Sequence, residues 1–319
     1  IVLDDNWGIY IADVCCNFPE DYSVSEVIKL NLETFVSNSN QETDLFDPFV
    51  LKKLNNSSYK ILFETVFFDN NNELNVVLNE SLITGEGDIL SNKIIYDPIH
   101  KISYPITIKD NKNGYLIALE ETQSRFKNTG EKGYPGFYKY SNGFCSEENC
   151  SEKNAFYPIH VALFDPSIIF KDNLYYVLAT DIFGNLRLFY GENLLSDNSF
   201  REHPKSPITN NPNYNRNAGR IFHSSGNLYR PSMQNEKRYG QSINLNKINK
   251  LSTTEYEESI YKNDFLRDSK FSKILNNGYY HHLEFLIDQD FDPNIRLPKG
   301  KIKLLLDGAK INRYRLHGK

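Results

Sequence analysis

The sequence predicts an all-β protein that folds as a single five-bladed β-propeller. Two observations carry this prediction. The composition favours strands over helices, and a strand–turn–strand pattern recurs at intervals of about 60 residues, a period that suits four-stranded blades. The repeat also predicts which polar side chains, distant in the sequence, meet around the central axis.

The composition is that of a strand-rich protein. The chain has 319 residues, 39% of them hydrophobic, and contains 21 Tyr and 21 Phe but only one Met. Aromatic and β-branched residues favour strands, whereas helical proteins rely more on Ala, Leu, Glu and Met. No linker rich in Gly, Pro or Ser divides the chain, so we expect one domain over residues 1–319. A β-sandwich, or two smaller β domains, is the alternative.

Five segments share a hairpin pattern, in which a Pro or polar residue precedes an apolar run, a polar turn and a second apolar strand. The clearest copies are Asp47–Thr65, Tyr104–Thr122 and Asp165–Asp181. Two weaker copies are Ala218–Gln234 and the segment that begins at His281 and ends at Gly308. Five hairpins at this period indicate five blades.

The first 46 residues precede the repeats. They contain an expected strand at Trp7–Ala12 and an expected short helix at Ser23–Leu32. Propellers often complete the last blade with a strand from the other end of the chain. We therefore expect Trp7–Ala12 to lie beside the C-terminal strands.

Charge and hydropathy exclude two classes of partner. The net charge is −5 and no basic block stands out, so the sequence does not indicate a nucleic-acid partner. No apolar run approaches the ~20 residues of a membrane span.

Cysteine and histidine spacing matches no zinc site, and we expect no metal or cofactor. Cys145 and Cys150 flank an acidic loop and could form a disulfide, although a cytoplasmic, reducing location is the default expectation.

The repeat predicts two rings of polar residues at one mouth of the central funnel. The first strand of each blade lies nearest the axis, and the second returns antiparallel to the same mouth. The first ring comes from the starts of the first strands: Asp47, Tyr104, Asp165, Gly219–Arg220 and His281–His282. The second ring comes from the ends of the second strands: Glu64, Glu120, Thr180 and Gln234. Arg230, on the fourth hairpin, is expected nearby.

These residue types suit acid–base chemistry on a polar substrate. Clustered carboxylates shift one another's pKa, so Asp47, Glu64, Glu120 and Asp165 are candidate catalytic groups. Arginine binds phosphate or carboxylate through two hydrogen bonds, and the candidate substrate-binding residues are Tyr104, Arg220, Arg230, Gln234, His281 and His282. The structural alternatives are turn-capping Asp residues and Arg residues that only neutralise the acids. Strand alternation lets only one of the two His side chains face the funnel.

The hairpin sequence DPSIIFKDNLYYVLATD resembles the blade signature of the five-bladed, family 43-like glycoside hydrolases. A wider set of motifs resembles the propeller domain at the N-terminus of plant glucosamine inositolphosphorylceramide transferases. These motifs are Asp47-Pro48-Phe49, Phe63-Glu64, Gly85-Glu86-Gly87-Asp88-Ile89, Ser103-Tyr104-Pro105, Glu120, Asp165-Pro166-Ser167, Gly219-Arg220-Ile221-Phe222, Leu228-Tyr229-Arg230-Pro231, Gln234, Tyr239-Gly240, His281-His282 and Asp307-Gly308.

The resemblance implies a carbohydrate-active propeller. Carried over from the hydrolase relatives, Asp47 would be the base, Asp165 the orienting partner, and Glu120 or Glu64 the acid. Tyr104 departs from the pattern, because a second-blade Asp is expected there. In the transferase relatives the propeller is joined to a separate transferase domain, so the chain is expected to be one module of a longer protein or to work with such a partner.

Three functions follow from these observations. The first is sugar transfer in glycan or glycoconjugate assembly, on a substrate that contains a phosphate. The second is inverting glycoside hydrolysis of the arabinanase or xylosidase type, which requires two opposed carboxylates with room for a water molecule. The third is glycan binding without catalysis.

Overall fold

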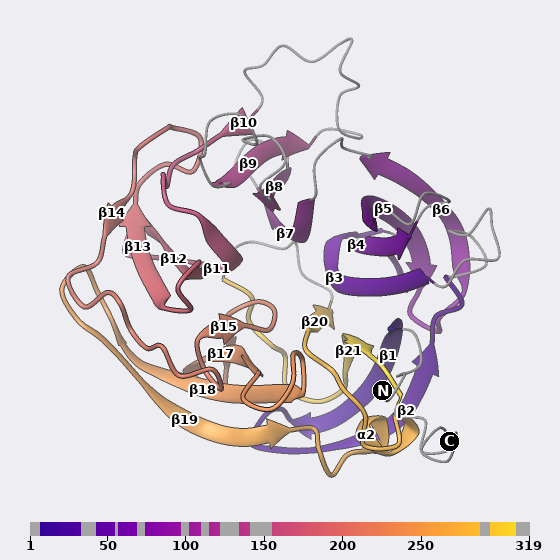
Figure 1. The fold of residues 1–319 in the computed structure, drawn as a ribbon. Helices are drawn as coiled ribbons and strands as arrows, with labels where there is room; N and C mark the ends of the chain where they lie inside the picture. Colours follow the sequence, from indigo (N-terminus) through magenta and orange to yellow (C-terminus); the bar gives the residue numbers. More distant parts are fainter. Residues whose placement is uncertain are drawn as a thin grey trace, which may run out of the picture.

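Five antiparallel sheets stand around a central axis, and in each sheet the strand nearest the axis is the first of its hairpin (Figure 1). A computed structural model describes residues 7–32, 43–54, 57–68, 74–96, 102–109, 115–121, 134–140, 155–287 and 294–310. The predicted five-bladed β-propeller is confirmed.

The strands follow one another from the axis to the rim in four of the blades. Blade 1 contains β3 (Thr43–Lys53), β4 (Ser58–Phe68), β5 (Leu74–Thr84) and β6 (Ile89–Tyr96). Blade 2 contains β7 (Ile102–Lys109), β8 (Tyr115–Glu121), β9 (Pro135–Tyr140) and β10 (Ala155–Phe156). Blade 3 contains β11 (Leu163–Lys171), β12 (Leu174–Asp181), β13 (Leu186–Gly191) and β14 (Arg201–Glu202). Blade 4 contains β15 (Arg216–Asn217), β16 (Phe222–Ser224), β17 (Asn227–Gln234), β18 (Ser242–Leu251) and β19 (Tyr256–Phe265).

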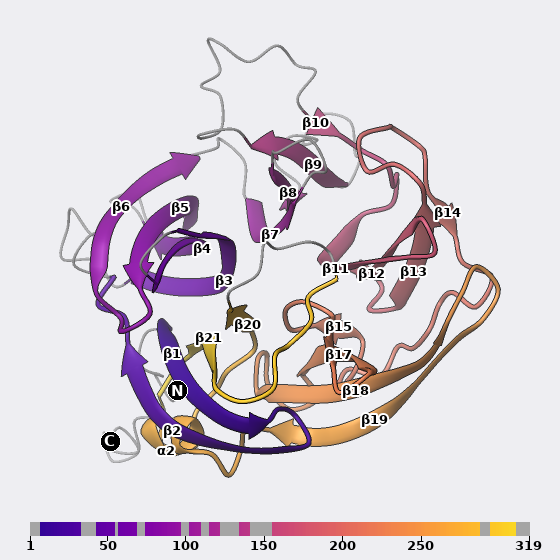
Figure 2. The ribbon, with the colours of Figure 1, turned by 180° about the vertical axis from the view of Figure 1, so that it is seen from behind.

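Blade 5 is built from both ends of the chain. From the axis outward it contains β20 (Leu283–Leu286), β21 (Ile302–Gly308), β1 (Gly8–Asn17) and β2 (Asp21–Lys29). Strand β1 lies beside β21 (Figure 2). The two strands are antiparallel, and Gly8 is opposite Gly308. The expectation that the strand beginning near Trp7 lies beside the C-terminal strands is confirmed. The ring of blades is therefore closed by hydrogen bonds between residues from the two ends of the chain.

The prediction of a short helix at Ser23–Leu32 is wrong, because most of this segment belongs to the strand β2. The sequence DYSVSEVIK places apolar and polar residues in near alternation, and the burial of its side chains alternates along most of the strand. That period fits a half-buried strand better than a helix. The neighbouring edge of β1 supplies the pairing partner, which local sequence could not reveal.

Three inner strands are interrupted at the same point of the repeat. Asp47, Tyr104 and Asp165 have positive φ angles of 47°, 55° and 49°, and the register of each strand shifts there. In blade 4 the equivalent residue is Gly219, with φ of 114°, and the inner strand is divided into β15 and β16 around it. Positive φ is uncommon for residues with a side chain. Its repetition marks a shared bulge that redirects the side chain relative to the strand.

Apolar side chains fill the spaces between neighbouring blades. The largest cluster joins blade 5 to blades 1 and 4, and includes Ile11, Phe63, Phe222, Phe285 and Leu305, which are fully or almost fully buried. The described helix is α2 (Lys270–Ile274), and Ser269 accepts a hydrogen bond from Ser272 N at its start. Within the described ranges, no helix has both the length and the apolar character that crossing a membrane requires.

Candidate functional site

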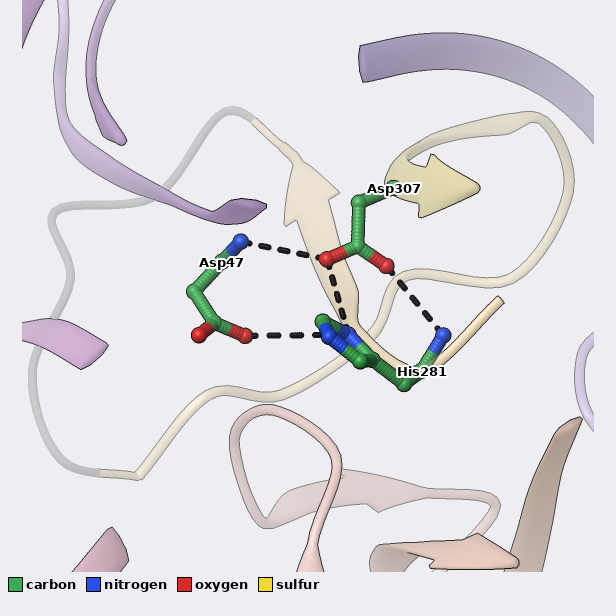
Figure 3. A group of neighbouring side chains, drawn as sticks. All are labelled: Asp47, His281 and Asp307. Atoms are coloured by element: carbon green, nitrogen blue, oxygen red, sulfur yellow. Dashed lines mark hydrogen bonds and ion pairs between the residues drawn. The ribbon is translucent and has the colours of Figure 1, made fainter. Parts of the chain in front are cut away.

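The inner strands bring Asp47, Asp165 and the two histidines to one mouth of the propeller. Asp47 comes from the bulge of β3, and His281 and His282 immediately precede β20. All four side chains are at least 94% buried, since Asp47 is the most exposed at 6%. Figure 3 shows Asp47, His281 and Asp307 in contact with one another. The first predicted ring is thus assembled from blades 1, 3 and 5.

Asp307, at the end of β21, organises this group. Its Oδ1 accepts hydrogen bonds from the backbone N–H groups of His281 and His282, at 3.2 and 3.0 Å. Its Oδ2 accepts from the backbone N–H of Asp47 at 3.1 Å and lies 2.8 Å from His281 Nδ1 (Figure 3). One fully buried carboxylate therefore holds the backbone of two blades in register.

Both histidines face the mouth, contrary to the expectation that alternation allows only one. The Nδ1 atoms of His281 and His282 lie 3.8 and 3.2 Å from Asp47 Oδ1. The physical reason is that the two residues precede β20 and are not bound by its pleat. Two imidazoles consequently surround a single carboxylate.

These contacts shift the pKa values of Asp47 and His281 in opposite directions. Burial alone would raise the pKa of Asp47, but the imidazoles of His282 and His281 and the neighbouring Glu64 hold it below its ordinary value. Burial would lower the pKa of His281, but the negative charges of Asp307, Asp47 and Asp165 raise it. The arrangement therefore favours an ionised Asp47 beside a charged His281.

Asp165 lies in different surroundings. Burial raises the pKa of its carboxyl group, as does the negative charge of Asp47, while the Arg216 guanidinium partly opposes this rise. Arg216 Nε lies 2.5 Å from Asp165 Oδ2, and the Arg216 side chain is 25% exposed. Two carboxyl groups of the same mouth thus have pKa values displaced in opposite directions.

Aromatic rings cover the group. The Trp7 ring stacks on His281 with centroids 4.6 Å apart, and the Tyr239 ring meets His281 edge-on at 5.2 Å. The Arg216 guanidinium lies 5.2 Å from the centroid of the Tyr239 ring. Tyr239 is 52% exposed, so it presents an accessible aromatic surface directly above the buried charges.

Tyr104 is completely buried and spans the axis. Its hydroxyl accepts a hydrogen bond from Gly219 N at 2.8 Å, and its ring packs edge-on against Phe49 and His282. Burial, followed by the nearby charges of Asp165 and Asp47, raises the pKa of this hydroxyl. Where the hydrolase pattern leads one to expect an Asp, this chain has a neutral side chain that connects blade 2 to blade 4.

The two predicted arginines are engaged within the fold. Arg220 Nε lies 2.5 Å from Glu284 Oε2, and its guanidinium also donates to the carbonyl and hydroxyl oxygens of Thr107. Arg230 is fully buried, and its NH2 lies 2.6 Å from Glu258 Oε1 on the outer strand β19. Among the described residues, Glu284 and Glu258 are therefore the carboxylates that these two guanidinium groups pair with.

The second predicted ring is formed in part. Glu64 and Thr180 are buried, and they face Phe46 and Phe164, the residues before Asp47 and Asp165. In blade 4 that position belongs to Pro231, whose carbonyl accepts from Ala218 N, so Gln234 lies beyond it and accepts from Ser242 at 2.6 Å. Glu120, in β8, is opposite Ser103 in β7, but the side chain of Glu120 is outside the described part of the structure. Cys145 and Cys150 also lie outside the described residues.

Asp47, His281 and Asp307 are residue types that can bind a metal ion, and their candidate ligand atoms lie within 4.8 Å of one another. Asp307 accepts hydrogen bonds from three backbone N–H groups. His281 Nδ1 lies 2.8 Å from Asp307 Oδ2, but among the described residues neither this nitrogen nor the ring nitrogens of His282 make a hydrogen bond of good geometry.

Four residues of the mouth were not among the predicted site residues: Trp7, Arg216, Tyr239 and Asp307. Tyr239 and Asp307 occur in the motifs of the family resemblance, but no site role was assigned to them. Asp307 carried a usable signal, because it is an acidic residue directly after the apolar residues Leu304–Leu306, the same signal that selected Glu64. Trp7 is the single Trp of the chain and immediately precedes the closing strand β1. Arg216 lies in an Asn-rich segment whose hydrophobic pattern does not distinguish it.

Comparison with known sequences finds a similarity over part of the chain. Residues 156–291 match the family model described as "Glucosamine inositolphosphorylceramide transferase 1, N-terminal". The curated protein of that name from Oryza sativa subsp. japonica is 32% identical over 132 residues, which are 38% of this chain and 17% of the relative. The one from Arabidopsis thaliana is 28% identical over 158 residues, which are 47% of this chain and 19% of the relative. The matched segment is less than a fifth of either relative.

Comparison with solved structures gives the fold. A xylan β-1,4-xylosidase from Bacillus halodurans C-125 superimposes with a TM-score of 0.53 at 10% identity, over 80% of this chain and 55% of the other. An α-L-arabinofuranosidase from Podospora anserina superimposes with a TM-score of 0.52 at 8% identity, over 82% and 90%. The expected resemblance is confirmed: residues 156–291 are similar to the N-terminal region of glucosamine inositolphosphorylceramide transferase 1, on a fold shared with the five-bladed glycoside hydrolases.

Proposed function

We propose that this chain acts on a carbohydrate at the mouth formed by Asp47 and Asp165, and transfers a sugar in the assembly of a glycan or glycoconjugate. The observation that carries the proposal is the placement of two buried carboxyl groups from different blades at one mouth, in contrasting surroundings. The imidazoles beside Asp47 favour its ionised form, whereas burial of Asp165 favours its protonated form. An ionised carboxylate can accept a proton, and a protonated carboxyl group can donate one.

The proposed roles follow from these surroundings. Asp47 accepts the proton of the acceptor hydroxyl, and Asp165 orients the substrate and offers a proton. Glu64, which adjoins Asp47, and Glu120 remain candidate acids. A phosphate of an activated donor would meet Arg216, the guanidinium between Asp165 and Tyr239. Tyr239 offers its exposed ring to a sugar.

The relatives support the class of substrate. Their name describes a transferase for glucosamine, a sugar, and for inositolphosphorylceramide, a lipid that contains a phosphate. Because the matched segment is less than a fifth of these relatives, we propose that the propeller works with a transferase domain, either fused to it or supplied by a partner. A cytoplasmic location is part of the proposal.

Glycan binding without catalysis is the second candidate. Asp47 and Asp165 are only 6% and 3% exposed, while Tyr239 is 52% exposed. An accessible aromatic ring above inaccessible carboxyl groups suits stacking against a sugar without chemistry.

The test uses the 319-residue chain with nucleotide sugars and polyprenyl-phosphate sugars. Binding is measured by calorimetry, and transfer to a lipid-linked acceptor by mass spectrometry. For a catalytic mouth, Asp47→Asn and Asp165→Asn should reduce transfer by about 10²–10⁴-fold and leave binding within a few-fold. Asp172→Asn is the control, because Asp172 follows β11 at its opposite end and is 72% exposed.

The outcomes separate the candidates. Binding that is retained by Tyr239→Phe and lost in Tyr239→Ala, without any product from the unmodified chain, would favour the binding module. If no nucleotide sugar or lipid-linked sugar binds, the proposed transfer is wrong.

A further inference from the structure

Cys15 and Cys16 form an adjacent pair of free thiols at the end of β1, remote from the mouth. Cys15 is half-buried and Cys16 is exposed. They lie opposite Ser23 and Tyr22 in the hairpin that β1 forms with β2. Strand β1 closes the ring of blades, so a chemical change here occurs in the element that joins the two ends of the chain.

The backbone brings the two sulfur atoms to the same side. Successive residues of a regular strand point to opposite faces, which keeps their side chains apart. Here Cys15 Sγ and Cys16 Sγ are 2.7 Å apart. Cys16 has a φ of 80°, and the β1–β2 register shifts between Asp13 and Val14. A non-glycine residue held at positive φ is a strained feature that often marks a functional position.

The two thiols are not equivalent. The hydrogen bond with Cys16 is the main cause that lowers the pKa of the Cys15 thiol, and Ser23 Oγ, 3.0 Å from Cys15 Sγ, lowers it further. The same hydrogen bond raises the pKa of the Cys16 thiol. Because a thiolate is the reactive form, the lowered pKa favours reaction at Cys15 over reaction at Cys16.

We propose that Cys15 and Cys16 are a redox-active dithiol, which closes to a disulfide between adjacent residues by exchange with a small-molecule disulfide such as oxidised glutathione. The Cys15 thiolate attacks one sulfur of the oxidant, forms a mixed disulfide and releases one glutathione thiolate. The Cys16 thiolate then attacks Cys15 Sγ and displaces the second glutathione. Two protein thiols are oxidised, one glutathione disulfide is reduced to two thiols, and the protons pass to the released thiolates.

The disulfide would be labile and would alter its surroundings. Adjacent Cα atoms are about 3.8 Å apart, closer than the usual separation in disulfides, and strained disulfides are more easily reduced. Closing the ring requires the backbone at Cys16 to adjust. The Cys16 carbonyl accepts a hydrogen bond from Gly300 N at 3.2 Å, in the segment before β21. Cys15 also borders a cavity of about 300 Å³ lined by Tyr59 and Lys303. Oxidation should therefore change amide exchange at Gly300.

The test uses the full chain with Cys145 and Cys150 replaced by Ser, which leaves Cys15 and Cys16 as its cysteines. After treatment with oxidised glutathione, the intact mass should fall by the mass of two hydrogen atoms, with no glutathione attached. Replacing Cys16 by Ser in the same background should instead trap a stable glutathione adduct on Cys15. Ser23→Ala should slow the first step about threefold, because the Cys15 thiolate loses one hydrogen bond.

A denatured control shows whether the fold prepares the pair. In urea, ring closure should be slower by about tenfold, since nothing then holds the sulfur atoms together. Two results would overturn the proposal: stable double glutathione adducts or disulfide-linked dimers in place of the ring, or equal rates of closure in folded and denatured chain. Unchanged amide exchange at Gly300 on oxidation would contradict the proposed effect on the closing blade.

Discussion

At the scale of single residues, the mouth is held by interactions between charges that burial would otherwise disfavour. Asp307 is completely buried, and its partners are three backbone N–H groups and the imidazole of His281. A buried carboxylate is tolerated when hydrogen bonds and a cation compensate for the lost hydration. Because these groups stabilise one another only in their charged forms, the free energy of unfolding should depend on pH.

Replacing His281 by Gln should remove a pH-dependent part of the stability. The pKa of His281 is raised above its ordinary value of 6.5. Its contribution is therefore complete below pH 6.5 and is lost as the pH rises through the higher pKa of the folded state. At pH 6 the variant should be less stable by about 3–5 kcal/mol, because Asp307 and Asp47 lose a buried cation. Urea unfolding at several pH values measures both effects.

Trp7 provides a second measurement. It is the single Trp of the chain and stacks on the His281 ring, so its fluorescence should follow the protonation of that imidazole. His160→Gln is the control, because His160 is exposed. It should preserve both the slope of stability against pH and the Trp7 titration. If the free energy of unfolding of His281→Gln changes with pH as steeply as that of the unmodified protein, His281 is not the source of this pH dependence.

The sequence identified Asp47, Asp165 and His281 because each occupies the same position of a repeat. It could not reveal that Arg216 pairs with Asp165, because that contact depends on the path of a long connection between blades. It also assigned Arg220 and Arg230 to substrate. Their partners, Glu284 and Glu258, are distant in the sequence or on an outer strand, and only the tertiary structure identifies them.

At the scale of elements, the bulge of the inner strands determines where the side chains of the mouth point. In three blades the bulge residue carries a side chain at positive φ, and in blade 4 it is Gly219. A Cβ atom on Gly219 would lie 1.9 Å from the carbonyl oxygen of Leu283 in blade 5. Blades 4 and 5 therefore approach too closely at this point for any side chain.

Replacing Gly219 by Ala should destabilise the protein by about 3 kcal/mol or more, because the backbone must move away from Leu283. Gly226→Ala is a matched control. Gly226 also has a positive φ, of 79°, but a Cβ atom there would have no neighbour within 4 Å, so about 1 kcal/mol is expected from backbone strain alone. Urea unfolding of the two variants measures the difference. If both variants lose the same free energy of unfolding, the close approach of blades 4 and 5 adds nothing to the cost of Gly219→Ala.

The hairpins were predictable because apolar runs and polar turns define them locally, as at Asp165–Asp181, which forms β11 and β12 with their turn. The error at Ser23–Leu32 has the opposite cause. This segment is an outer strand whose partner, β1, belongs to a blade completed by residues nearly 300 positions away. Local periodicity alone distinguishes a short helix poorly from a half-exposed strand.

At the scale of the whole molecule, pairing of β1 with β21 closes the ring. The register runs from Gly8 opposite Gly308 to Val14 opposite Ile302, so the start of β1 and the end of β21 lie side by side. In each of the other blades, the strands that pair with one another are close in the sequence. Among the strands that the structure describes, β1 and β21 are the paired strands that lie farthest apart in the sequence.

This geometry predicts that a circular permutant should fold. The permutant joins Lys310 to Trp7 through a short Gly-Ser linker and opens the chain between Leu32 and Thr43. Blade 5 then becomes a continuous meander of β20, β21, β1 and β2, with a hairpin connection where the ends already meet. We expect the circular dichroism and the Trp7 fluorescence of the native order, with a free energy of unfolding within about 1 kcal/mol of it.

A second permutant, with the same linker but opened between Lys171 and Asp172, is the comparison. That opening separates β11 from β12, the hairpin that places Asp165 at the mouth, so it divides a blade that was local. It should be the less stable of the two in urea, because its inner hairpin must now close across the whole chain. If it proved the more stable, dividing the local hairpin of β11 and β12 would cost less than opening the chain between Leu32 and Thr43, and the argument from loop-closure entropy would be wrong.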